Sequence, residues 1–421
     1  MIKIEKYNGE AFRRRRIQAD ADVGEIIKDV AERGDRALFE YTQRFEGCRL
    51  DSLLVTGEEI ESAVLKVGEY FLETLRQAAA NIRAFHEKQV RAGFSMSCGS
   101  GSMLGQKVTP LERVGLYVPG GTASYPSTVL MNAIPAAIAG VSEIIMVTPP
   151  SREGKIRPEV LAAAKVAGVD RIYKVGGAQA IAALAYGTET IPKVDKIVGP
   201  GNRYVASAKR QVFGLVDIDM IAGPSEILIV ADGKADPVNI AADLLAQAEH
   251  DVLACAILIT DSIRLAERVQ SELERQLETL PRNAIARKSI EEQGGIFVCG
   301  SIEEAIGIAN DIAPEHIEIC TDEPMKYLPL VKNAGCVFLG GYSPEALGDY
   351  FAGTNHTLPT SGTARFASPL GVDSFVKRTS FIYYTKESLA QVYERVADFA
   401  RREGLEAHAR SIESRFREEE F

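Results

Sequence analysis

The feature that most limits the possible folds is an alternation, starting near residue 113, of short apolar runs and alanine-rich helical segments. Continuous apolar strands separated by helices are typical of a parallel sheet that is buried on both faces. Ligands of such sheets collect at the carboxyl ends of the strands, where glycine and proline turns lie here. The first four expected strands are Arg113–Val118, Glu143–Thr148, Arg171–Val175 and Lys196–Val198.

A second series follows, with a helix that Asp236 can cap and Pro237 can begin. We therefore predict the α/β class, with two incomplete Rossmann-like parallel-sheet domains, a pattern compatible with duplication. Helices are expected before residue 97 and in the charged tail, with Ser97–Ser102 as a polar link. The expected division is an N-terminal segment 1–20, a first domain 21–116 with 227–309, a second domain 117–226 with 310–370, and a tail 371–421. Strands are expected at 226–231, 252–260, 295–299 and 316–320, and helices at 262–279 and 302–310.

The bulk properties exclude several classes of protein. A chain of 421 residues is too long for one compact core. Its net charge of −10 argues against a nucleic-acid surface, and no run of about 18 apolar residues suggests a membrane span. The basic run Arg13–Arg16 precedes acidic sequence, so we expect a solvated helix face or subunit contact there, and no signal peptide. Six cysteines without a Cys-x-x-Cys pair indicate buried, reduced thiols in the cytoplasm.

Histidine is scarce, and four of the five histidines lie beside carboxylates or amides. Imidazole, carboxylate and amide oxygen are ligands that zinc accepts, and imidazole is the usual base near neutral pH. Each pair alone is a weak signal, because a histidine at a helix edge or in a polar loop is more often structural. Since neighbouring strand residues face opposite ways, Glu315 and His316 fit a base and its proton-relay neighbour better than a chelating pair. The four clusters are Gln247–His250, Glu315–His316, Asp349–His356 and Glu403–His408, whereas His86 is expected to be structural.

A nucleotide-binding fingerprint is missing, since no Gly-x-Gly-x-x-Gly follows an expected strand. Gly99–Gly105 has one residue too many and follows polar sequence. Gly199–Asn202, in contrast, ends a strand and opens a helix, so its backbone N–H groups could face a pyrophosphate. Such turns are also common without any ligand.

Taken together, these segments resemble the histidinol dehydrogenase family over nearly the whole chain, from Glu32–Leu38 to Ala407–His408. Every functional position of the family's pattern is present. The most specific matches are Arg113–Ala123, Val175–Thr188, Lys196–Asn202, Ala222–Glu226, Gln247–Asp251, Ala313–His316 and Gly353–Thr360.

The resemblance implies two successive NAD-linked oxidations, from L-histidinol through L-histidinal to L-histidine, which are the last steps of histidine biosynthesis. It also implies an intertwined homodimer with a shared active site, in which the partner donates His408 to zinc. The implied zinc ligands are Gln247, His250, Asp349 and His408. The implied catalytic pair is Glu315 and His316, the NAD contacts are Tyr117, Gln179 and Asn202, and the substrate contacts are Ser225, His316, His356, Glu403 and the four zinc ligands.

Other functions remain open at this point. The same ligands could serve a zinc hydrolase, with Glu315 activating a metal-bound water, or a metal-dependent dimer without catalysis. A related dehydrogenase of another small polyol or a sulfonated diol is the closest alternative. Glutamine is a weak zinc ligand, which suits a substrate-orienting site more than a structural one. No cysteine adjoins these motifs, which disfavours a covalent thiohemiacetal.

Overall fold

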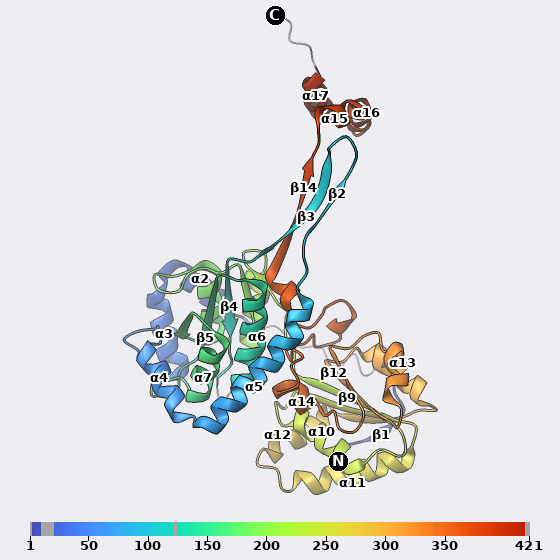
Figure 1. Cartoon of the computed structure of the whole chain (residues 1–421). Helices are drawn as coiled ribbons and strands as arrows, with labels where there is room; N and C mark the ends of the chain where they lie inside the picture. Colours follow the sequence, from blue (N-terminus) through green and yellow to red (C-terminus); the bar gives the residue numbers. More distant parts are fainter. Residues whose placement is uncertain (1, 10–20, 121–124, 417–421) are drawn as a thin grey trace, which may run out of the picture. The chain divides into compact units, whose positions relative to one another are not determined.

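The computed structural model describes residues 2–9, 21–120 and 125–416 (Figure 1). The described residues form two compact units, the larger made of Met1–Val90 and Leu111–Phe375 and the smaller of Arg91–Pro110 and Val376–Phe421. The larger unit holds two parallel sheets, so the predicted α/β class is confirmed. The basic run Arg13–Arg16 lies outside the described residues.

The first sheet contains the four strands that the sequence predicts and one short addition, in the order β6-β5-β4-β7-β8 with every pair parallel. Apolar runs and glycine or proline turns are therefore sufficient to locate these strands. The strands are β4 (Arg113–Tyr117), β5 (Glu143–Thr148), β6 (Arg171–Lys174), β7 (Lys196–Val198) and β8 (Asp217–Ile218). The intervening helices are α6 (Pro126–Ala139), α7 (Pro158–Ala167), α8 (Gly177–Tyr186) and α9 (Arg203–Val212).

The N-terminal helices pack on this first sheet, and here the expected domain division is wrong. Ile82 shares a buried core with α6 and α7, and Val30 shares another with α8. Residues 21–116 thus do not form a domain with 227–309. An amphipathic helix pattern predicts a buried face, but it does not identify the sheet that covers that face. The helices are α2 (Gly24–Arg33), α3 (Asp35–Glu46), α4 (Gly57–Lys66) and α5 (Glu69–His86).

The second sheet has the order β1-β11-β10-β9-β12-β13, and all its pairs are parallel. Since β12 pairs with β9, the segment after residue 310 joins this sheet and does not complete the first one. The strands are β1 (Ile4–Glu5), β9 (Glu226–Ala231), β10 (Cys255–Thr260), β11 (Gly295–Val298), β12 (His316–Cys320) and β13 (Cys336–Leu339). The helices are α10 (Pro237–Ala248), α11 (Ile263–Leu277), α12 (Asn283–Glu292), α13 (Ile302–Ile312) and α14 (Glu345–Tyr350).

The smaller unit is an antiparallel ribbon followed by three helices. Its strands β2 (Phe94–Ser97), β3 (Met103–Pro110) and β14 (Val376–Tyr383) run in the order β14-β3-β2. The glycine-rich Gly99–Gly105 segment forms the hairpin turn and the start of β3, so it is neither a nucleotide loop nor an unstructured link. Its helices are α15 (Lys386–Ala390), α16 (Tyr393–Arg402) and α17 (Glu406–Glu413).

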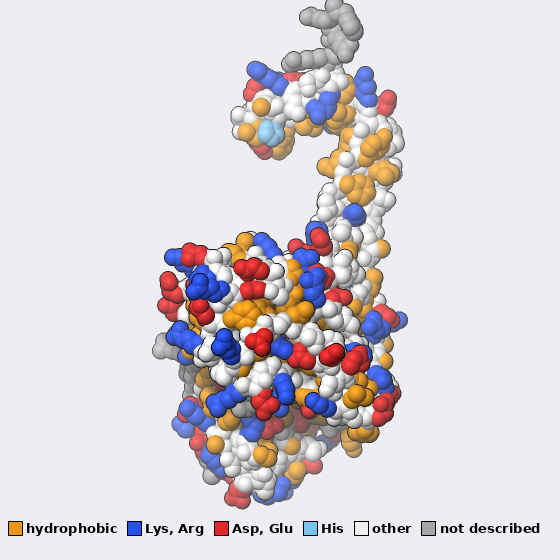
Figure 2. Space-filling view, turned by 90° about the vertical axis from the view of Figure 1, so that its left-hand side faces the viewer, with side chains coloured by type: hydrophobic (Ala, Val, Ile, Leu, Met, Phe, Trp, Pro, Cys, Tyr) orange, Lys and Arg blue, Asp and Glu red, His pale blue; other side chains and the backbone are white. Residues whose placement is uncertain are grey.

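The ribbon exposes an unusual amount of apolar surface, visible as orange side chains along it in Figure 2. All of β2 and nearly all of β14 is exposed. A small sheet without a covered apolar face is marginally stable in water, so this surface needs a covering layer. The exposed side chains are Phe94, Met96, Met103, Phe381, Ile382 and Tyr383.

The six cysteines are all free, of which Cys48 and Cys255 are buried and Cys98 is exposed in the hairpin turn. Among the described helices, none is both long and apolar enough to cross a membrane.

Candidate active site

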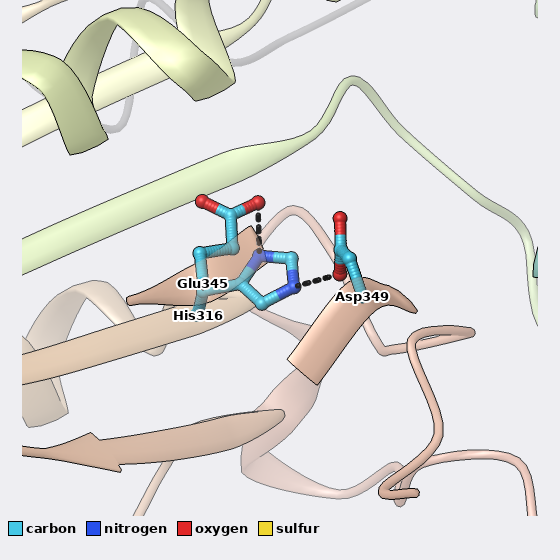
Figure 3. Close-up of side chains that lie close together, drawn as sticks. All are labelled: His316, Glu345 and Asp349. Carbon is cyan, nitrogen blue, oxygen red and sulfur yellow. Dashed lines mark ion pairs between the residues drawn. The ribbon is translucent and has the colours of Figure 1, made fainter. Parts of the chain in front are cut away.

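A histidine and two carboxylates converge beside the second sheet (Figure 3). His316 opens β12, while Glu345 and Asp349 are four residues apart on α14 and therefore share one face of that helix. One potential ligand atom from each residue lies within 4.8 Å of the other two. Within the part of the chain that the structure describes, these three side chains form a group that could hold a metal ion.

The two nitrogens of His316 differ in their surroundings. Its Nδ1 lies 3.0 Å from the backbone oxygen of Glu226, 3.5 Å from Glu345 Oε1 and 3.8 Å from Glu315 Oε2. The backbone oxygen of Glu226 is the nearest of these and can only accept a hydrogen bond, so Nδ1 carries a proton. Nε2 has no hydrogen-bond partner among the described residues and lies 3.7 Å from Asp349 Oδ1. In the neutral ring, Nε2 is therefore the nitrogen that can accept a proton from a bound molecule.

Gln247 approaches this cluster from the last turn of α10, with its Nε2 3.3 Å from His316 Nδ1. Three buried polar atoms here have no hydrogen-bond partner within the described residues: Gln247 Oε1, His316 Nε2 and Glu345 Oε2. Buried polar atoms are nearly always paired, so a group of unpaired ones indicates a binding position. An amide oxygen, an imidazole nitrogen and carboxylates are suitable ligands for a divalent cation.

Burial dominates the electrostatics of the site. It raises the pKa of Glu315 to about 8 and the pKa of Glu345 to about 8. Burial alone would lower the pKa of His316, but the nearby carboxylates of Glu345 and Glu315 outweigh it and hold that pKa well above its usual value. The cluster therefore retains protons, and a bound cation would favour their release.

The other predicted residues of this region lie around the cluster. His356, in the loop after α14, has its Nδ1 3.0 Å from the backbone oxygen of Asp349. His250 follows α10, and its charge is coupled to those of Asp349 and His316. Burial lowers the pKa of both His250 and His356. Ser225 directly precedes Glu226 at the start of β9.

This cluster lies at the amino ends of the second sheet's strands, since His316 and Glu226 are the first residues of β12 and β9. The rule that ligands collect at carboxyl ends therefore does not predict its position. The loop carrying His356 contacts α6, which follows the carboxyl end of β4 in the first sheet. The carboxyl side of one sheet thus adjoins the amino side of the other.

Two predicted residues are not part of this cluster. Glu403 and His408 belong to the smaller unit, where both are exposed. They line a hollow of about 790 Å³ whose walls are mainly apolar. Its apolar lining includes Leu389, Val392, Val396, Phe399, Leu405 and Ile412.

The three predicted cofactor residues lie at the carboxyl edge of the first sheet. Tyr117 ends β4, and its hydroxyl accepts a hydrogen bond from the backbone of Gly177 at 3.1 Å. Gln179 is 1% exposed, and its Nε2 has no partner among the described residues. Asn202 caps α9 through its side chain. The buried side-chain amide of Gln179 could therefore donate a hydrogen bond to a ligand at this edge.

The turn before Asn202 is tightly built. Gly199 has a φ of +108°, and a Cβ there would lie 2.2 Å from the backbone oxygen of Tyr117. Asp219 accepts a hydrogen bond from the Gly199 backbone at 2.7 Å and pairs with Lys209, and both side chains of that pair are almost completely buried. Only glycine fits this close approach, and the Gly199 backbone oxygen accepts a hydrogen bond from Lys209 Nζ at 3.0 Å.

Three residues of this region, Glu345, Glu226 and Thr128, could not be predicted as site residues from the sequence. For Glu345, the sequence offers one signal, which is its spacing from Asp349: residues four apart on a helix share a face. The contact of the Glu226 backbone oxygen with His316, and that of Thr128 with His356, join segments 90 and 228 residues apart. No local pattern indicates such contacts.

The fold and the cluster define an α/β enzyme with a buried acid–base centre. Comparison with known proteins identifies the family. The sequence profile of "Histidinol dehydrogenase" matches residues 11–416. The histidinol dehydrogenase of Listeria monocytogenes serovar 1/2a is 59% identical over 403 residues, covering 96% of this chain and 94% of the relative. That of Geobacillus kaustophilus is 57% identical over 419 residues, covering 98% and 99%.

A crystal structure of histidinol dehydrogenase from Elizabethkingia anophelis superposes with a TM-score of 0.93, at 38% identity and with 98% and 97% of the two chains covered. The chain belongs to the histidinol dehydrogenase family. It is therefore an oxidoreductase, and the resemblance inferred from the sequence is confirmed.

Proposed function

We propose that this chain oxidises L-histidinol through L-histidinal to L-histidine, the last steps of histidine biosynthesis, with zinc and NAD+ as cofactors. Family membership supports the reaction. The observation that carries the assignment to this cluster is the convergence of the unpaired buried atoms Gln247 Oε1 and His316 Nε2 beside Asp349.

His316 is the base of the alcohol step. Its Nε2 takes the proton of the substrate hydroxyl, while the hydride leaves the carbon that bears this hydroxyl. The contact of Nδ1–H with the Glu226 backbone oxygen, at 3.0 Å, fixes the ring and keeps Nε2 basic.

Glu315 is the base of the aldehyde step. Water adds to the aldehyde carbon as Glu315 takes a proton from the water, and the resulting gem-diolate then loses the second hydride from that carbon to give the acid. A carboxyl whose pKa burial raises to about 8 is a far stronger base than an exposed one. The backbone N–H of Glu226 holds one Glu315 oxygen at 2.9 Å.

We assign the zinc ligands as Gln247, His250 and Asp349 with His408 of a second copy. Zinc, when bound, would orient and polarise the oxygen on the reacting carbon. Glu345 Oε1 lies beside this position, 3.5 Å from His316 Nδ1. Ser225, His356 and Glu403 join the ligands as substrate contacts, which suits the amine and imidazole of histidinol.

The dinucleotide is assigned to the carboxyl edge of the first sheet, against Tyr117, Gln179 and Asn202. The buried Gln179 amide, whose Nε2 has no partner among the described residues, supports this position. NAD+, when bound, takes up one hydride in each oxidation.

A homodimer accounts for the smaller unit. The ribbon and the hollow around Glu403 and His408 expose apolar side chains that need a cover, and both residues are distant in sequence from the other ligands. We propose that a second copy covers them and thereby receives these two side chains into its own site. The six free cysteines suit the reducing cytoplasm.

Anaerobic turnover with limiting L-histidinol and excess NAD+ tests the function. We expect two NADH and one histidine for each histidinol consumed, loss of activity on chelation, and recovery with zinc. No NADH from folded, zinc-loaded protein would contradict the assignment, as would a single NADH with accumulating aldehyde.

A further inference from the structure

A threonine of the first sheet contacts a histidine of the second. Thr128 Oγ1 lies 3.3 Å from His356 Nε2, and Thr128 is only 2% exposed on α6. The two residues are 228 positions apart in the chain. Neither sequence analysis nor the proposed mechanism assigns a role to Thr128.

The contacts of His356 determine its tautomer. Its Nδ1 lies 3.0 Å from the backbone oxygen of Asp349, which can only accept a hydrogen bond, so Nδ1 carries a proton. In the neutral ring the other nitrogen, Nε2, has no proton. Nε2 then carries a lone pair, and the Thr128 hydroxyl donates to it.

The backbone around His356 is anchored independently of Thr128. The Asn355 side chain donates to the Met131 backbone oxygen at 2.7 Å and accepts from the Thr357 backbone at 2.8 Å. Thr357 Oγ1 donates to Asn132 Oδ1 at 3.2 Å. The loop is thus fixed to α6 on both sides of His356, so loss of the Thr128 hydroxyl would free the ring and leave the loop in place.

We propose that Thr128 is a positioning residue for the substrate, which acts by holding the His356 ring in one orientation from its Nε2 side. The inference depends on the proposed function through the role of His356 in substrate binding.

Thr128→Val, which removes the hydroxyl and keeps the shape, tests this in the zinc-loaded full chain. We expect KM for L-histidinol to rise about five-fold, as for one lost hydrogen bond, with KM for NAD+ unchanged. Thr128→Ser restores the hydroxyl and should return KM toward the wild-type value. The matched control is Thr42→Val in α3, since Thr42 is equally buried and its hydroxyl has no partner in the described structure.

A second readout is independent of turnover. In ¹⁵N-histidine-labelled protein, His356→Gln assigns the His356 signals, and the wild type should carry its proton on Nδ1. Thr128→Val should shift the Nε2 resonance, and Thr42→Val should not. A proton on Nε2 in the wild type would overturn the inference, as would equal KM values in the two valine variants. If wild-type protein does not oxidise histidinol, the proposed function fails, while the ring spectra still decide the role of Thr128.

Discussion

The side chain of Glu318 accepts a hydrogen bond from the backbone N–H of Glu345 at 2.7 Å. Glu318 stands two residues after His316 on β12, so both side chains point to the same face of the strand. Glu345 opens α14, the helix that carries Asp349. The buried carboxyl group of Glu318 thus fixes β12, which carries the proposed base His316, relative to α14, which carries the proposed zinc ligand Asp349.

We expect Glu318→Ala to release the start of α14 and to lower zinc affinity by about 10- to 100-fold, the usual effect of losing a group that orients a metal ligand. Glu318→Gln keeps an acceptor oxygen and should stay within a few fold of wild type. Competition with a chromophoric chelator measures the affinities. Equal zinc binding by both folded variants would contradict this role of Glu318.

Asp243 should make the protein less stable as the pH rises. Burial raises its pKa from 3.8 to about 6, with a smaller opposing effect of its hydrogen bond to Glu318. Between these two values the folded state binds the proton and the unfolded state does not, so the free energy of unfolding is greatest below about pH 4 and falls as the pH passes 6.

Asp243→Asn removes this loss, which amounts to at most about 3 kcal/mol at 1.36 kcal/mol for each pKa unit. Its stability relative to wild type should therefore be higher at pH 8 than at pH 5. Urea unfolding at the two pH values measures the difference. If the free energies of unfolding of the variant and the wild type differ by the same amount at pH 5 and pH 8, the carboxyl of Asp243 does not titrate in this range.

Glu315→Gln should separate the two oxidations. The variant keeps an oxygen for the Glu226 N–H but cannot take a proton from water. We expect the aldehyde step to slow by about 10²- to 10⁴-fold, the usual worth of a general base, and the alcohol step to slow far less. Single-turnover rates starting from histidinol and from histidinal measure the two steps. Equal slowing would refute the separate role of Glu315.

Lys209 and Asp219 form a buried ion pair whose side chains are 2% and 1% exposed. Lys209→Met leaves the carboxylate buried without its partner, which should cost about 3–5 kcal/mol and weaken NAD+ binding through the Gly199 turn. Lys234→Met is the matched control, because the Lys234–Asp322 pair is exposed and should contribute almost nothing. Urea unfolding and NAD+ titration test both effects, and similar behaviour of the two variants would contradict them.

Much of this fold follows from local patterns. The apolar runs at Arg113, Glu143 and Glu226 predict strands because burial on both faces requires continuous apolar sequence. Asp236 and Pro237 predict the start of α10 for an equally local reason, and the side chain of Asp236 does accept from the Val238 backbone.

The rest depends on contacts that no local pattern encodes. The ribbon strands β2 and β3 were missed because their pattern lacks a buried face, and β14 pairs with β3 from about 270 residues further along the chain. For the same reason, the sequence does not predict which of the two sheets α2–α5 lie against. At the site, histidine scarcity and motif resemblance indicate His316 and Asp349, while Glu345 becomes apparent only when β12 and α14 are side by side (Figure 3).

The central claim is that the buried cluster and the two exposed residues of the smaller unit are two parts of one catalytic centre, contributed by different copies. Mixing inactive His316→Gln and His408→Asn subunits tests it most directly. Random reassortment makes half of the dimers mixed, each with one intact site, so the account predicts about a quarter of the wild-type activity. Mixed dimers that stay inactive, although they form and bind NAD+, would contradict it.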